Sequence, residues 1–242
     1  MKRKSASIAF VRSKPIHLSF SLRSFALILL GVVVASAQTS ADELIKRGKE
    51  LLAQKQYYEA SKVFDAAVKA DPASAEAYCY RGKLSLDDAK GIADLNKAIE
   101  LRPDYAEAYY ERGLKYDLAN NSAAALADYN KALLLNPRFL EAYRTRAVLY
   151  LLAGKGEAAI SDYTKIVELK PDGESYYMRG NSYLELGQDA KAIVDLTKSI
   201  ELDPKYYWAY MQRAKAYRHL NRFKLAQADE AKAAQIGPPK VD

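Results

Sequence analysis

The sequence predicts an all-α fold, a solenoid of about six helix-turn-helix repeats. Prolines recur at a nearly constant spacing of 31, 34, 34, 33 and 34 residues, by subtraction of their positions. Each period has room for two helices and a turn, and small and aromatic residues recur in phase within it. A fixed period of this length is the signature of a stacked repeat architecture. The prolines are Pro72, Pro103, Pro137, Pro171, Pro204 and Pro238.

The first half of each repeat carries a small residue, which in most repeats lies four positions after one aromatic residue and three positions before another. The first aromatics are Tyr78, Tyr109, Tyr143, Tyr176 and Tyr210. The small residues are Gly48, Gly82, Gly113, Ala147, Gly180 and Ala214. The second aromatics are Tyr116, Tyr150, Tyr183 and Tyr217. The second half carries a small residue, an aromatic residue and a further small residue, as in Ala125, Tyr129 and Ala132.

These motifs resemble the tetratricopeptide repeat (TPR) family, whose period is about 34 residues. The resemblance implies a right-handed superhelical TPR solenoid over residues 38–242. The expected repeats lie at about 41–72, 75–103, 106–137, 140–171, 173–204 and 207–238. No repeat can bury its own apolar face alone, so we expect the stacked neighbours to share one continuous core.

Small residues in the first helix of each repeat have a structural interpretation. We expect Gly48, Gly82, Gly113 and Gly180 to lie where two antiparallel helices cross closely, because only a minimal side chain fits there. A leucine at Gly113 would overpack this crossing and cost about 1–3 kcal/mol. The aromatic positions recur at helical spacing and should fill the seam between the helices.

An arginine precedes each small residue, and an aspartate lies nine residues before five of the prolines. The arginines are Arg47, Arg81, Arg112, Arg146, Arg179 and Arg213. The aspartates are Asp94, Asp128, Asp162, Asp195 and Asp229. The two series either bind a charged ligand or form partly buried pairs that fix the stacking of helices. We favour the pairs and take Arg112 and Asp128 as structural residues, because charges so close to the core need partners. The sequence leaves open whether the pairs lie within or between repeats.

Three repeats depart from the pattern. The first has Val63 in place of the aspartate, as expected of a terminal repeat. The second is three residues short between Gly82 and Pro103, so its hairpin should lack about one helical turn. This shortening is either neutral drift in a loop or a functional notch in the superhelix, and we favour drift. The last repeat ends in a polar helix that is typical of a solubilising cap.

Residues 1–37 have the pattern of a secretory signal peptide. Basic residues without any acid precede an apolar run from Phe25 to Ala35, and a small-x-small site ends at Ala37. The run is shorter than the roughly 20 apolar residues of a comfortable membrane span. We therefore expect cleavage after Ala37, no stable membrane span, and a secreted or periplasmic product. An organelle transit peptide is the alternative.

The remaining chain carries almost no net charge. Removal of residues 1–37 takes away 6 of 37 basic residues and leaves 31 basic and 30 acidic ones, a charge near +1. This balance argues against nucleic-acid binding, which needs a basic face. His219 is then the only histidine and Cys79 the only cysteine, and no zinc-ligand spacing or phosphate-binding loop is present. We expect no catalytic residue, no metal site and no cofactor, and hence no enzyme.

The TPR resemblance implies a concave surface, lined by the first helix of each repeat, that binds a protein or peptide partner. Aromatic and arginine side chains are favoured at such binding sites. The alternative is that these side chains only cover a curved surface. The candidate groove residues are Tyr110, Arg144, Tyr177, Asn181, Met211, Lys215 and Arg218.

A further resemblance fails at the residue level. Some cytosolic TPR co-chaperones bind a C-terminal carboxylate with a set of Lys and Asn residues. The comparable places here hold Ile45, Lys49, Tyr80, Glu107 and Glu111, so this specificity does not carry over.

Two functional hypotheses follow. The first is an exported, non-enzymatic scaffold or adaptor that binds a partner segment in the concave groove. The second is a structural component of an envelope assembly, which would act through self-association as a homo-oligomer or through packing by its convex face or terminal repeats.

Overall fold

The computed structural model describes residues 41–239 of the chain. The expected signal peptide, residues 1–37, lies outside these residues. Its cleavage and the location of the protein therefore stay predictions.

The described chain consists of helices joined by short turns. The first helix covers residues 41–53. The others are α2 (Tyr57–Ala70), α3 (Ala75–Leu84), α4 (Asp88–Leu101), α5 (Ala106–Leu118), α6 (Ser122–Leu135), α7 (Leu140–Leu152), α8 (Gly156–Leu169), α9 (Gly173–Glu185), α10 (Asp189–Leu202), α11 (Tyr207–His219) and α12 (Phe223–Ile236). None of these described helices is both long enough and apolar enough to cross a membrane.

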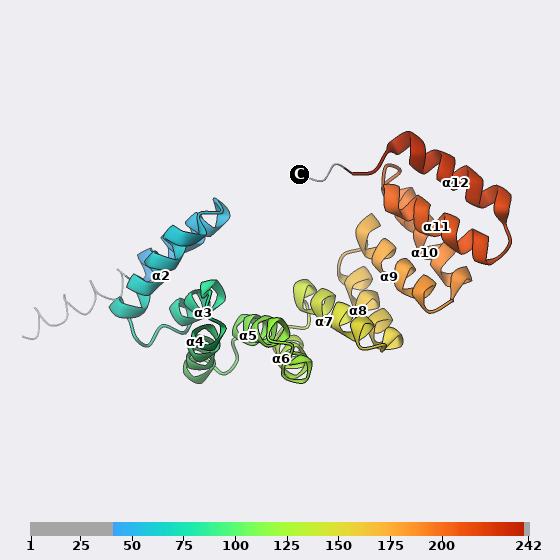
Figure 1. Ribbon diagram of the computed structural model, residues 1–242. Helices are drawn as coiled ribbons and strands as arrows, with labels where there is room; N and C mark the ends of the chain where they lie inside the picture. The colour runs from blue at the N-terminus through green and yellow to red at the C-terminus, as the bar shows by residue number, and fades with distance from the viewer. Residues whose placement is uncertain (1–40, 240–242) are drawn as a thin grey trace, which may run out of the picture.

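The helices follow one another around an open arc (Figure 1). Along the middle of the arc, α3, α5, α7 and α9 lie toward the inner side, and α4, α6, α8 and α10 lie toward the outer side. Buried residues form a series of small clusters along the arc. The predicted all-α solenoid is therefore confirmed.

The two helices of a repeat cross closely at the small residues. A Cβ atom added to Gly113 would lie 2.7 Å from Cε1 of Tyr129, whose side chain is fully buried. A Cβ at Gly82 would lie 2.8 Å from the carbonyl oxygen of Gly91, and one at Gly180 would lie 3.0 Å from Cγ of Leu196. A Cβ at Gly48 would overlap the ring of Phe64. Larger residues at these positions would force the helices apart.

Five arginines each hold the aspartate of their own repeat with two parallel hydrogen bonds. In the third repeat, Nε of Arg112 donates to Oδ2 of Asp128 at 2.8 Å, and Nη2 donates to Oδ1 at 2.7 Å. Nη1 of the same arginine donates to Oδ1 of Asn96 in the preceding repeat at 2.7 Å. The question that the sequence left open is thereby answered: the ion pair lies within a repeat, and the third donor reaches the neighbour. The pairs are Arg81–Asp94, Arg112–Asp128, Arg146–Asp162, Arg179–Asp195 and Arg213–Asp229.

The helical turn that the second repeat lacks is missing from its first helix, α3. Helix α3 has 10 residues, whereas α5, α7, α9 and α11 have 13 each. Helices α5, α7, α9 and α11 are followed within two residues by a left-handed residue, such as Asn120 (φ 57°) or Gly154 (φ 70°). Such a residue ends a helix and reverses the chain. Helix α3 ends instead at Leu84 and is followed directly by Ser85, whose backbone is extended.

Candidate partner-binding surface

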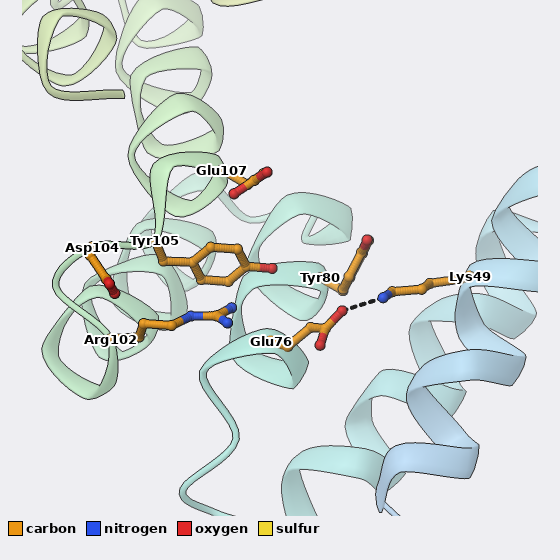
Figure 2. A pocket seen from close by; sticks show the side chains of 7 residues that line it. All are labelled: Lys49, Glu76, Tyr80, Arg102, Asp104, Tyr105 and Glu107. Atoms are coloured by element: carbon orange, nitrogen blue, oxygen red, sulfur yellow. Dashed lines mark ion pairs between the residues drawn. The ribbon is translucent and has the colours of Figure 1, made fainter. Parts of the chain in front are cut away.

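A polar cavity of about 480 Å³ lies where the first three repeats meet. It is bounded by first helices and by the turn from α4 to α5 (Figure 2). Its lining residues are Lys49, Glu76, Tyr80, Arg102, Asp104, Tyr105 and Glu107. The first helices of the repeats supply Lys49, Glu76, Tyr80 and Glu107, as the TPR resemblance implies for a groove.

One wall of the cavity is an ion pair between repeats. The Lys49 ammonium contacts the Glu76 carboxylate, as the dashed line in Figure 2 marks. This hydrogen bond raises the pKa of Lys49, although desolvation acts in the opposite direction. Lys49 also lies 5.5 Å from the centre of the Tyr80 ring. Burial raises the pKa of Tyr80, so its phenol is neutral near pH 7.

The opposite wall is formed by Arg102 and Tyr105. The Arg102 guanidinium stacks on the Tyr105 ring, with 3.5 Å between Cζ and the ring centre. Arg102 follows the last residue of α4 and Tyr105 precedes the first residue of α5, so the Pro103 turn holds them three residues apart. Nε of Arg102 is buried and has no hydrogen-bond partner, and no described residue forms an ion pair with this side chain. The side chain as a whole is partly exposed, so its terminal Nη groups can receive an acceptor from a partner.

The charges of the cavity can recognise a polar segment. The ion pair neutralises Lys49 and Glu76, which leaves Arg102 as the cation of the lining without a carboxylate partner among the described residues, beside the carboxylates of Asp104 and Glu107. Such a site is complementary in charge to a partner segment that carries an acidic group next to a basic one. A planar guanidinium binds a carboxylate with two parallel hydrogen bonds.

The structure places two of the candidate groove residues mainly in contacts between repeats. The Tyr110 ring packs 4.8 Å from the ring of Phe139, and its hydroxyl lies 3.3 Å from Oγ1 of Thr145. The Tyr177 ring packs 5.0 Å from the ring of Tyr206. Burial raises the pKa of both Tyr110 and Tyr177. Alanine at either position would open the stack as well as alter the surface.

Three candidate cations already have carboxylate partners. Arg144 contacts Glu174 of the next repeat at 3.1 Å, and Lys215 lies 3.5 Å from Glu185 of the preceding repeat. Arg218 contacts Glu230 at 2.6 Å. The pairs of Arg144 and Lys215 join successive repeats, whereas that of Arg218 lies within the last repeat, and a ligand would have to compete with all three.

The last two candidates lie partly exposed on α9 and α11. Oδ1 of Asn181 is buried and has no hydrogen-bond partner within residues 41–239, and Met211 is half-buried. The structure does not bring the seven candidates together at one cavity, so their role in binding stays a prediction. Sequence reasoning missed Arg102 and Tyr105 because it searched the first helices and not the turns. The signal was present as Arg-Pro-Asp-Tyr at one closing proline.

The single thiol and the single described histidine have ordinary surroundings. Cys79 is buried, and burial raises the pKa of its thiol to about 12, so it is protonated and unreactive. His219 lies on the surface with Nδ1 2.8 Å from Oδ1 of Asp189.

Comparison with known proteins identifies the repeats. Tetratricopeptide repeat profiles match residues 45–88, 116–174 and 173–206. This chain belongs to the tetratricopeptide repeat family. Residues of this TPR protein are 35% identical over 81 positions to the human mitochondrial import receptor subunit TOM70, and 35% identical over 78 positions to the Hsp70-Hsp90 organizing protein 1 of soybean, Glycine max. Those matches cover 32% and 30% of this chain but only 13% of each relative.

Solved structures of TPR proteins share the fold. A TPR protein from Parabacteroides merdae superposes with a TM-score of 0.63 at 20% identity, over 84% of this chain and 82% of that one. The C-terminal part of a TPR protein from Cytophaga hutchinsonii gives a TM-score of 0.68 at 19% identity, over 79% and 78%. YrrB, a TPR protein with an unusual peptide-binding site, gives 0.63 at 21% identity, over 74% and 94%. At these identities the likeness concerns the fold alone.

Proposed function

We propose that this TPR protein is an exported, non-enzymatic scaffold that binds a segment of a protein partner on its inner surface. The observation that carries this proposal is the Arg102 guanidinium, which stacks on Tyr105 in an open polar cavity and has no carboxylate partner among residues 41–239. A carboxylate of a partner would supply charge-assisted hydrogen bonds to the exposed part of this guanidinium.

The comparisons support a protein as the ligand. TPR relatives include an import receptor subunit and a chaperone-organizing protein, and YrrB has a peptide-binding site. The chemistry of the cavity favours a segment with an acidic group for Arg102 and a basic group for Asp104 or Glu107. Export is supported by the basic, apolar and small-residue pattern of residues 1–37.

A paired capture experiment tests the binding proposal. The full chain with a C-terminal tag would be expressed in its source organism and crosslinked, as wild type and as Arg102→Ala. The matched control is Arg138→Ala, because Arg138 is an exposed cation just after the next closing proline. We expect one partner to be retained by wild type and by Arg138→Ala and lost from Arg102→Ala. Equal retention by all three would refute the assignment of the inner cavity.

Cell fractionation tests export in the same strain. We expect the protein outside the cytoplasm, with Gln38 as its first residue by N-terminal sequencing. A cytoplasmic protein that begins at Met1 would contradict export and leave the binding proposal intact.

A further inference from the structure

The shortened second repeat opens a second cavity, separate from the inner one. This cavity measures about 790 Å³ and lies between α2 and α4, above the turn that ends α3. Large, exposed side chains lie at its rim. The exposed fraction is 58% for Tyr57 and 72% for Tyr58, and Leu86 is fully exposed. Its lining residues are Tyr57, Tyr58, Ser61, Asp65, Arg81, Leu84, Ser85, Leu86, Asp87, Lys90, Ala93 and Asp94.

In other repeats, an aromatic side chain lies beside the arginine that corresponds to Arg81. In three of them the guanidinium faces the second aromatic of the repeat. The distances from Cζ to the ring centre are 5.9 Å for Arg112 and Tyr116, and 5.7 Å for Arg146 and Tyr150. In the last repeat the distance between Arg213 and Tyr217 is 5.9 Å. A cation over an aromatic ring at this distance is attracted to it.

The second repeat keeps the arginine but lacks the aromatic. The position three residues after Gly82 is Ser85, and Arg81 retains only its first tyrosine, Tyr78, at 5.2 Å. Arg81 still holds Asp94 with bonds of 2.7 and 2.6 Å, so the guanidinium is fixed in the place where the other repeats stack a tyrosine. Arg81, Ser85 and Asp94 all line the cavity.

We propose that this cavity binds an aromatic side chain of a partner protein, which takes the place that a tyrosine occupies in the later repeats. The ring would stack on the guanidinium of Arg81, between the exposed tyrosines of α2 and Leu86. This site lies between two second helices of the repeats, and it does not depend on the inner-surface function proposed above.

The charges at the rim specify the neighbours of that aromatic residue. Three carboxylates and two cations line the cavity, and the two cations already contact Asp65, Asp94 and Asp87. Asp65 and Asp87 remain about half exposed, at 52% and 49%. A surface with excess negative charge favours a partner with basic residues. The partner segment is therefore an aromatic residue flanked by lysine or arginine.

A peptide titration tests the site. The probe is acetyl-Lys-Tyr-Lys-amide, added to the isotope-labelled full chain and followed by amide chemical shifts. The matched probe is acetyl-Lys-Leu-Lys-amide, which keeps the charge and lacks the ring. We expect shifts confined to residues 57–94, and an affinity at least about tenfold weaker for the leucine peptide because the cation–π contact is lost. Equal affinity of the two peptides, or shifts centred elsewhere, would overturn the proposal.

Two variants localise the binding. Ala93→Trp fills the cavity from an exposed position of α4, and Ala127→Trp is its match, because Ala127 is exposed and also directly precedes the paired aspartate of its repeat. We expect Ala93→Trp to abolish the shifts and Ala127→Trp and Arg102→Ala to preserve them. Leu86→Asn, at a fully exposed position, removes an apolar contact without adding charge and should weaken binding without altering the fold. Unchanged binding by both Ala93→Trp and Leu86→Asn would refute the site.

Light scattering on the free chain tests whether a second copy of the chain, rather than a different protein, occupies the cavity. A monomer agrees with a foreign partner. A dimer that Ala93→Trp converts to a monomer would show that a second copy of the chain fills the cavity, and it would overturn the proposal.

Discussion

Removal of one aspartate from the Arg–Asp series should destabilise the solenoid strongly. In the third repeat the Asp128 side chain is 8% exposed and that of Arg112 is 20% exposed, and two bonds of 2.8 and 2.7 Å join them. Asp128→Ala leaves a largely buried guanidinium with Asn96 as its one remaining acceptor in the described part of the chain. Breaking a buried pair costs about 3–5 kcal/mol. The residual exposure of Arg112 favours the lower end, about 3 kcal/mol.

Thermal unfolding measures this loss. For a domain of this size, 1 kcal/mol lowers the Tm by about 2–4 °C, so Asp128→Ala should lower it by about 6–12 °C. Because solenoid stability is a sum over repeats and interfaces, amide exchange should rise most in α5 and α6.

Two controls separate the ion pair from a general effect of substitution. Asp104→Ala removes an exposed carboxylate without an ion pair among the described residues and should leave the Tm unchanged. The double variant Arg112→Met/Asp128→Leu replaces both charges by apolar groups and should regain most of the loss. A Tm change below about 2 °C in Asp128→Ala, or a double variant no better than the single one, would refute this account of the pair.

Three further changes test other parts of the structure. Gly113→Ala places a Cβ 2.7 Å from the Tyr129 ring and should cost about 1–3 kcal/mol, read from urea unfolding; unchanged stability would mean that the crossing is looser than described. Burial opposes ionisation of Asp172, but hydrogen bonds from the lysine two residues earlier and from Ser175 outweigh it and lower its pKa to about 2. A depressed pKa stabilises the fold above the unfolded value near about 4, and this contribution is lost as pH falls toward 2; Asp172→Asn should therefore flatten the dependence of stability on pH between about 4 and 2, and an unaltered profile would contradict the shift. Arg102→Ala should leave the Tm unchanged or slightly raised while it abolishes partner binding, and a large fall in Tm would instead make Arg102 a structural residue.

The repeat architecture could be predicted from the sequence because the same motif recurs in successive repeats. The glycine or alanine at the helix crossing, the aromatic residues around it and the closing proline recur in register, so one ambiguous position is corrected by five others. The shortening of the second repeat was also visible, as three residues missing between Gly82 and Pro103. The sequence favours neutral drift over a notch because it does not show which side chains border the gap. In the structure a cavity with exposed tyrosines lies there.

The sequence by itself determined the helices, their pairing into repeats and the need of Arg112 and its counterparts for acidic partners. Only the tertiary structure decided which partner each charge contacts, because residues 16 positions apart meet only when two helices pack. The same reason explains why Tyr110 packs between repeats while Arg102 stacks on Tyr105 at the wall of a cavity. Periodicity fixes the face of a helix on which a side chain lies, whereas its neighbours across the stack depend on the superhelical geometry that all the repeats create together.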